Sequence, residues 1–297
     1  MTASSTTGMS GWISKFVRGS SARQYAPATS FMLIIPLLVT FAIGFFYPVW
    51  MLVDLSFSTG AAPYLRLVEE TLYVEVLLTT VVTAGLVAFF CLGLGYPVAY
   101  AMARLGRTGA LITAACVFIP LWTSVLIRSY AWIVLLQRNG IVNGLLQGTG
   151  LTDEPIKLLY TQGAVILAMT HVLLPFAILP IHSTLRMLPR DLGRAAANLG
   201  AGPIRTFVSI TLPLSLPGVF AGTILCFVLA LGFYITPALV GGPGSMLMAT
   251  LIGQQTTVVL DWPFAAALST VLLALTLIIV IAFRRAFALS KGFTSVH

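Results

Sequence analysis

Charged residues are scarce in this sequence. They make up 8% of its 297 residues, whereas about 25% is typical of soluble globular domains. Hydrophobic residues account for 58% of the chain, and the mean hydropathy is +1.00. Apolar runs of this kind, with so few charges, predict an all-α polytopic membrane protein.

Residues that carry catalysis or bind metals are also rare. The three cysteines lie inside apolar runs without metal-ligand spacing, so we interpret them as small core residues. We interpret His171 and His182, eleven residues apart, as isolated histidines whose hydrogen bonds are satisfied, with a paired role such as a proton relay as the alternative. Neither G-x-x-x-x-G-K-[ST] nor H-E-x-x-H occurs. The chain is therefore not predicted to be an enzyme, and we expect it to hold no metal or cofactor itself.

Six apolar runs are long enough to cross about 30 Å of hydrocarbon as helices. The first is too long for the apolar region of a cleaved signal peptide, so we interpret it as a span. A disordered tail at 1–28 precedes the membrane domain at 29–285, and a short tail at 286–297 follows it. The expected spans are 29–53, 76–103, 109–136, 161–185, 216–240 and 264–285.

The charged residues sort by side when these spans are drawn. With the N-terminus in the cytoplasm, most of the 16 Lys and Arg residues lie inside, and seven of the eight acids lie outside. Such sorting follows the positive-inside rule and predicts that both termini are cytoplasmic. The net charge of +8 is then explained by topology and does not indicate a nucleic-acid partner.

The cytoplasmic segment 186–217, between the fourth and fifth spans, is too long for a simple turn. We predict a short helix that starts near Pro189 and stops at Gly200. A second short helix is expected over 203–209, with Pro213 as its end. The first helix carries an apolar stripe of Leu192, Ala195, Ala196 and Leu199.

Small residues at the break between these helices favour close approach of another backbone. We therefore predict a helix-in-groove contact with a second protein. An interfacial helix on the inner leaflet is the alternative, which the small number of large apolar residues disfavours.

This segment resembles the "EAA" loop of ABC importer permeases. The pattern is E-A-A, three residues, G, nine residues, I, one residue, L-P. The matching positions here are Ala195, Ala196, Gly200, Ile210, Leu212 and Pro213. Arg194 stands where the family has Glu, so a salt bridge made by that Glu is not expected here.

The resemblance extends over residues 30–285 to permeases of the spermidine/putrescine class. It implies a type I importer permease fold in the bacterial inner membrane. It also implies a second permease subunit, two ATPase subunits that bind ATP and Mg²⁺, and an external solute-binding protein. The residues that it assigns to ATPase docking are Leu192, Arg194, Ala195, Ala196, Leu199, Gly200, Ile210, Leu212 and Pro213.

Arg128 is the one charge well inside an expected span. A charge at such depth costs about 2.5–3.5 kcal/mol on insertion scales, so it faces a cavity or a partner, or it snorkels to the headgroups. The pathway residues that we propose on this basis and on the resemblance are Arg128, Trp132, Phe233, Tyr234 and Thr236.

A polyamine is the expected solute from the resemblance alone, because no acid lies deep in a span to bind a cation. Aminoethylphosphonate, an opine, thiamine and iron(III) are alternatives within the class. Two other functions are a membrane anchor that recruits a cytoplasmic partner and an ion-driven carrier. The scarcity of buried titratable groups disfavours the carrier.

Overall fold

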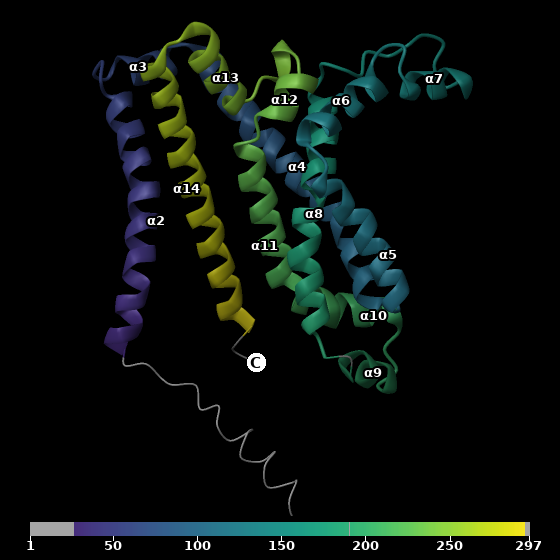
Figure 1. Cartoon of the computed structure of the whole chain (residues 1–297). Coiled ribbons are helices and arrows are strands. Elements are labelled where there is room, and N and C mark those ends of the chain that lie inside the picture. The colour runs from purple at the N-terminus through teal and green to yellow at the C-terminus, as the bar shows by residue number, and fades with distance from the viewer. Residues whose placement is uncertain (1–26, 190, 295–297) are drawn as a thin grey trace, which may run out of the picture. The chain divides into compact units, whose positions relative to one another are not determined.

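The structure is a computed structural model that describes residues 27–189 and 191–294, and all regular structure within them is helical (Figure 1). The chain divides into two units, Met1–Met51 and Leu52–His297. The predicted disordered tail lies almost wholly outside the described residues. Among the described residues, five helices are long and apolar enough to span a membrane, and a bent pair makes a sixth candidate. The predicted all-α fold is therefore confirmed.

The first apolar run forms helix α2 (Pro27–Ser56), which begins in the first unit and contains Pro36 and Pro48. The last one forms α14 (Trp262–Thr294), whose apolar part covers Trp262–Arg285. Both agree with the predicted spans to within a few residues.

Three long helices of the second unit pack against one another: α4 (Thr71–Arg104), α8 (Gln162–Met187) and α11 (Leu212–Leu231). Glycine allows the close approach of α11 to α8, because a Cβ on Gly222 would lie 2.9 Å from the Ala177 carbonyl oxygen. Small residues at such contacts are typical of membrane helices, where van der Waals packing drives association. The buried core between these helices includes Val87, Cys91, Val165, Met169, Leu173, Ala177, Cys226, Ala230 and Leu231.

Two of the three cysteines belong to this core. The Cys91 thiol donates to the Thr170 carbonyl at 3.6 Å, and the Cys226 thiol donates to the Leu173 carbonyl at 3.5 Å. Their interpretation as small core residues is confirmed. For Cys116 it was wrong, because this side chain is exposed.

The third predicted span, 109–136, is not one helix. It consists of α5 (Arg107–Phe118), a 3-10 turn, and α6 (Val125–Leu136), which α7 (Ile141–Gly148) follows. The two apolar halves meet at 100°. The bend has a local cause, since Thr123 and Ser124 are extended and the Ser124 hydroxyl caps α6 by accepting from the Leu126 amide at 3.3 Å.

The fifth predicted span, 216–240, is wrong beyond Leu231. The chain leaves α11 at Gly232 and forms short helices across the end of the bundle. Pro237 prevents continuation, because it has no N–H for the Phe233 carbonyl. These segments are α12 (Ile235–Val240), a 3-10 turn (Pro243–Ser245), α13 (Met248–Gln254) and a π-helical turn (Gln255–Val259).

Hydrogen bonds attach this returning segment to three other elements. The buried hydroxyls of Ser129 on α6 and Thr236 on α12 lie 3.0 Å apart. The Tyr160 amide donates to the Val240 carbonyl at 3.1 Å, and the Met248 amide donates to the Thr80 hydroxyl at 2.8 Å. These bonds fix α12 and α13 against α6, α4 and the chain before α8.

Helix α3 (Ala62–Glu69) lies at the same end and is joined to α14 by charge. The Arg66 guanidinium binds Glu70 at 3.0 Å and Asp261 at 3.5 Å, and lies over the Phe264 ring at 4.4 Å. The hydrogen bond with Glu70 raises the pKa of Arg66 above its ordinary value. All three charged side chains are at least one-third exposed, so these bonds orient α3 more than they stabilise the fold.

Candidate functional site

The first short helix of the predicted docking segment is α9 (Asp191–Asn198), and the chain turns after it at Gly200, as expected. Gly200 has a φ of +79°, in the left-handed region that glycine adopts without strain. The Gly200 amide donates to the Ala197 carbonyl at 3.0 Å, and the Ala201 amide donates to the Ala196 carbonyl at 2.9 Å. These two bonds are the Schellman motif, which satisfies carbonyls at a helix end and turns the chain sharply.

The outward face of α9 differs from the predicted one at one position. Arg194 and Leu199 have exposed fractions of 81% and 88%, and Ala195 is exposed as well. Ala196, in contrast, is 7% exposed and packs within the chain, so it offers almost no surface to a partner. Arg194 pairs with Asp191 at 3.5 Å, and this pair is open to solvent.

The second predicted helix starts at Pro203 as expected, but its predicted end at Pro213 was wrong. Helix α10 (Pro203–Thr206) leads through a π-helical turn (Phe207–Thr211) directly into α11. The wide turn accommodates Pro213, whose ring would clash with the Ser209 carbonyl in a regular α-helix. The positions Ile210, Leu212 and Pro213 therefore belong to the start of a long helix, and Pro213 alone of the three is exposed.

Aromatic contacts join this turn to α4. The Phe207 ring packs edge-on against Tyr96 and Tyr100, with centroids 5.8 and 5.5 Å away. The Tyr96 hydroxyl also lies 2.9 Å from the Ser215 hydroxyl on α11. These contacts join the predicted docking segment to both α4 and α11. Figure 1 shows α9 and α10 at one end of α8 and α11, and α6, α7, α12 and α13 toward the other.

Arg128 lies on α6 with an exposed fraction of 9%. Its Nε and Nη1 atoms are buried, and neither has a hydrogen-bond partner within the described residues. This burial does not fit a side chain that snorkels to the headgroups. Arg128 is therefore a buried cation whose Nε and Nη1 atoms have no hydrogen-bond partner among the described residues, which is unusual for a charge at this depth.

Trp132, one turn further along α6, contacts a residue that the sequence did not single out for the pathway. Its Nε1–H donates to Nδ1 of His171 on α8 at 3.3 Å, and the two rings meet edge-on at 5.7 Å. The interpretation of His171 as a satisfied histidine is therefore confirmed at Nδ1, with Trp132 as its partner. The two residues are 39 positions apart, so no local pattern links them.

The other predicted pathway residues follow α11. Phe233 is half-buried against the core, and Tyr234 is 45% exposed. The Tyr234 ring lies directly against Gly253 of α13, where any Cβ would clash with it. Thr236 is fully buried, and its hydroxyl is bonded to Ser129, so it offers no surface to a solute in this structure.

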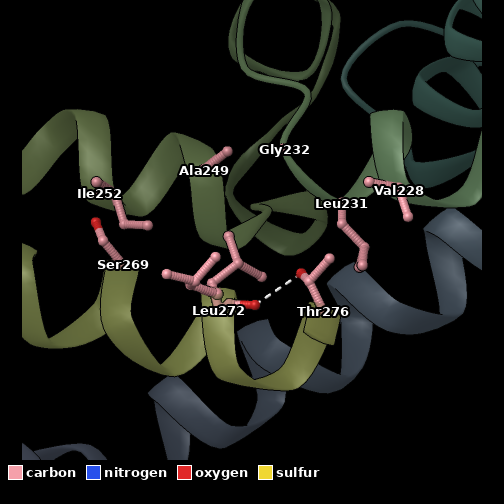
Figure 2. A pocket seen from close by; sticks show the side chains of 9 residues that line it. Val228, Leu231, Gly232, Ala249, Ile252, Ser269, Leu272 and Thr276 are labelled. Carbon is pink, nitrogen blue, oxygen red and sulfur yellow. Dashed lines mark hydrogen bonds between the residues drawn. The ribbon is translucent and has the colours of Figure 1, made fainter. Parts of the chain in front are cut away.

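A cavity of about 410 Å³ lies between α11, α13 and α14 (Figure 2). Its lining is mostly apolar. The hydroxyls of Ser269 and Thr276 donate to carbonyls of their own helix, Ala265 and Leu272, at 2.8 and 2.7 Å. No donor of the lining is left to orient a polar solute, so we do not assign the solute site to this cavity. The lining residues are Val228, Leu231, Gly232, Ala249, Ile252, Ser269, Leu272, Leu273 and Thr276.

Comparison with known proteins defines the class. Residues 8–290 match the family described as binding-protein-dependent transport system inner membrane component. In structure, the chain is similar to a bacterial ABC transporter involved in the import of alginate. The TM-score is 0.72 at 18% identity, over 87% of this chain and 94% of the other. A second structure of such a transporter, in complex with an alginate-bound periplasmic protein, has the same TM-score.

Individual relatives are also similar in sequence. The spermidine/putrescine transport system permease protein PotB of Escherichia coli is 35% identical over 229 residues, which is 77% of this chain and 83% of PotB. The inner membrane ABC transporter permease protein YdcU of the same species is 36% identical over 212 residues, 66% of each chain. The molybdenum permease ModB of Mycobacterium bovis is 30% identical over 208 residues, 69% of this chain and 76% of ModB.

The chain belongs to the family of binding-protein-dependent inner membrane permeases. It is the permease subunit of an ABC importer, located in the inner membrane, and the predicted fold, function and location are confirmed. The family consists of transporter subunits and is not a catalytic family.

Proposed function

We propose that this permease forms the solute pathway together with a second permease subunit and moves its solute inward by alternating access. Two cytoplasmic ATPase subunits would bind ATP and Mg²⁺ and drive the cycle, and an external binding protein would deliver the solute. The single observation that supports this arrangement best is the exposed turn of α9. It presents Leu199 beside a Schellman-capped Gly200 and connects through Phe207 to α4 and α11.

The docking surface that we propose for the ATPase consists of Arg194, Ala195, Leu199 and Gly200. A protruding apolar side chain on a short helix suits a groove on a partner. Arg194 is basic, so its ion pairs differ from those of the Glu that the family has at this position. Asp191 is its partner within this chain, and we expect an acidic residue of the ATPase to replace Asp191 on docking.

We propose a polyamine as the solute, on the basis of the 35% identity to PotB. The described spans contain no acid at depth, so the carboxylates that bind ammonium groups would come from the second permease or the binding protein. The buried Arg128 favours a second candidate, a solute that carries a carboxylate or phosphonate as well as an amine. Aminoethylphosphonate and an opine have this chemistry, whereas thiamine and iron(III) remain candidates from the class alone.

Reconstitution of the complete importer in liposomes tests the proposal. We expect the spermidine-loaded binding protein to stimulate ATP hydrolysis and to support spermidine uptake. The ligand of the binding protein is determined first, by titration with spermidine, putrescine, 2-aminoethylphosphonate and octopine. ATP-independent uptake would indicate an ion-driven carrier. ATPase recruitment without uptake of any ligand would indicate an anchor.

A further inference from the structure

His171 is a polar side chain on a surface where lipid would be expected. It lies nine residues into α8, about 14 Å from the start of this helix at 1.5 Å per residue. This depth is inside the hydrocarbon layer of about 30 Å. The side chain is nevertheless exposed on the surface of the chain.

The hydrogen bond with Trp132 determines which imidazole nitrogen carries the proton. Nδ1 accepts from the indole N–H, so it is unprotonated, and the proton of the neutral ring is on Nε2. Arg128 lies one turn before Trp132 on α6. The pair of Trp132 and His171 therefore presents a neutral imidazole whose Nε2–H has no acceptor among the described residues.

Lipid tails offer no acceptor to Nε2–H, and unsatisfied polar groups are costly in hydrocarbon. Polar residues at this depth face a water-filled cavity or another subunit. Trp132 supports the first choice, because it is half-buried and its polar N–H is directed to His171, so that two polar groups lie together at this surface. We propose that Trp132 and His171 form a hydrogen-bonded wall of the aqueous solute pathway, with His171 as a solute-contact residue.

This inference rests on the proposed importer function and refines it. A neutral imidazole beside an indole offers aromatic faces that attract an ammonium group, and unlike the nearby Arg128 it carries no positive charge. Trp132 acts as the positioning residue, because its N–H holds the imidazole in one tautomer and one orientation. His171 is then a determinant of solute selectivity supplied by this subunit.

Thiol labelling in the complete importer tests whether His171 faces water. Cys116, the exposed native thiol, is first replaced by Ser. We expect His171→Cys to react with a water-soluble methanethiosulfonate and the reaction to be slower during turnover with spermidine. Phe89→Cys, at an exposed apolar position of α4, is the control and should react slowly. If both cysteines react equally slowly, His171 faces lipid or a subunit interface, and the proposal fails.

Uptake kinetics with spermidine test the contact itself. We expect His171→Arg to raise KM about tenfold, because it places a fixed cation at the wall. Trp132→Phe, which removes only the N–H and reduces the ring, should raise KM about threefold. The controls His182→Gln on α8 and Trp122→Phe should keep the wild-type KM.

The outcomes of these experiments distinguish a failure of the proposed importer function from a failure of the proposed solute contact at His171. If the unmodified importer does not transport spermidine, the proposed solute is wrong, whereas the labelling of His171→Cys still decides whether the wall faces water. If spermidine is transported and His171→Arg leaves KM unchanged, the solute contact is refuted although the function stands. A lower Vmax with unchanged KM would assign His171 to packing and would also refute the contact.

Discussion

Gly200 combines two properties at the tip of the docking segment: a left-handed backbone and an open Cβ position, with no atom within 4 Å. Asn and Asp tolerate this conformation better than other residues with a side chain. A substitution by Asp therefore tests charge and bulk at the docking turn without a large backbone penalty.

We expect Gly200→Asp to abolish most ATP-driven uptake while the permease remains folded, because a carboxylate would be buried against the ATPase. Gly200→Asn is the matched control, since it adds the same shape without the charge, and it should keep more activity. Uptake in liposomes and the amount of ATPase that co-purifies measure the effect. Near-normal uptake by Gly200→Asp would contradict the docking assignment.

Among single residues, the sequence pointed to those that are conspicuous by themselves. It did not point to residues whose role depends on contact with a distant partner. Gly200 and Arg128 stand out because glycine and charge are locally conspicuous. His171 did not, since its importance depends on a bond to Trp132 that forms only when α6 and α8 pack together. Ala196 matched a motif, but its inward orientation is set by packing that spacing does not specify.

Among the elements, α13 has an unusual start. Its first amide, that of Met248, is satisfied by the Thr80 hydroxyl of α4, and no side chain of the local N-cap, Leu247, contributes. Thr80 is fully buried and also donates to the Val76 carbonyl at 2.7 Å. One side chain from a distant helix thus caps α13.

Thr80→Val keeps the shape and removes the hydroxyl, which leaves the Met248 amide unsatisfied. The expected cost is about 1–3 kcal/mol of folding free energy, seen as a lower unfolding temperature of the permease in detergent. Thr270→Val is the control, because the Thr270 hydroxyl bonds only within α14, to Ala266. Equal losses for both variants would show that the contact between α4 and α13 adds nothing.

The boundaries of α4, α8 and α14 followed from hydropathy, because lipid and core both select apolar side chains along a continuous helix. The breaks at Ser124 and Gly232 did not. Apolar residues continue across both, so composition cannot distinguish a straight span from one that turns through 100°. The π-helical turn before α11 was missed for a related reason, since Pro213 was interpreted as a stop when a wider turn accommodates it.

For the whole molecule, the sorting of charges predicts which end faces the cytoplasm. Leu199, 88% exposed at the docking turn, and Leu151, 73% exposed after α7, belong to segments at opposite ends of α8 (Figure 1). In a chain with Cys116→Ser, a membrane-impermeant maleimide should label Leu199→Cys only from the cytoplasmic side. Leu151→Cys should be labelled only from outside.

The reverse pattern of labelling would invert the topology and remove the docking proposal with it. Added ATPase should protect Leu199→Cys and leave Leu151→Cys reactive. This protection distinguishes a docking surface from a segment that is merely cytoplasmic.

Helix α8, which packs against both α4 and α11, contains Pro175 and Pro180. Neither proline has an N–H, so the carbonyls of His171 and Phe176 have no donor four residues later. Because these two backbone hydrogen bonds are missing, α8 bends more easily in its middle than toward its ends. We expect a tilt imposed at the proposed docking end to bend α8 at these prolines, which lie between that end and His171.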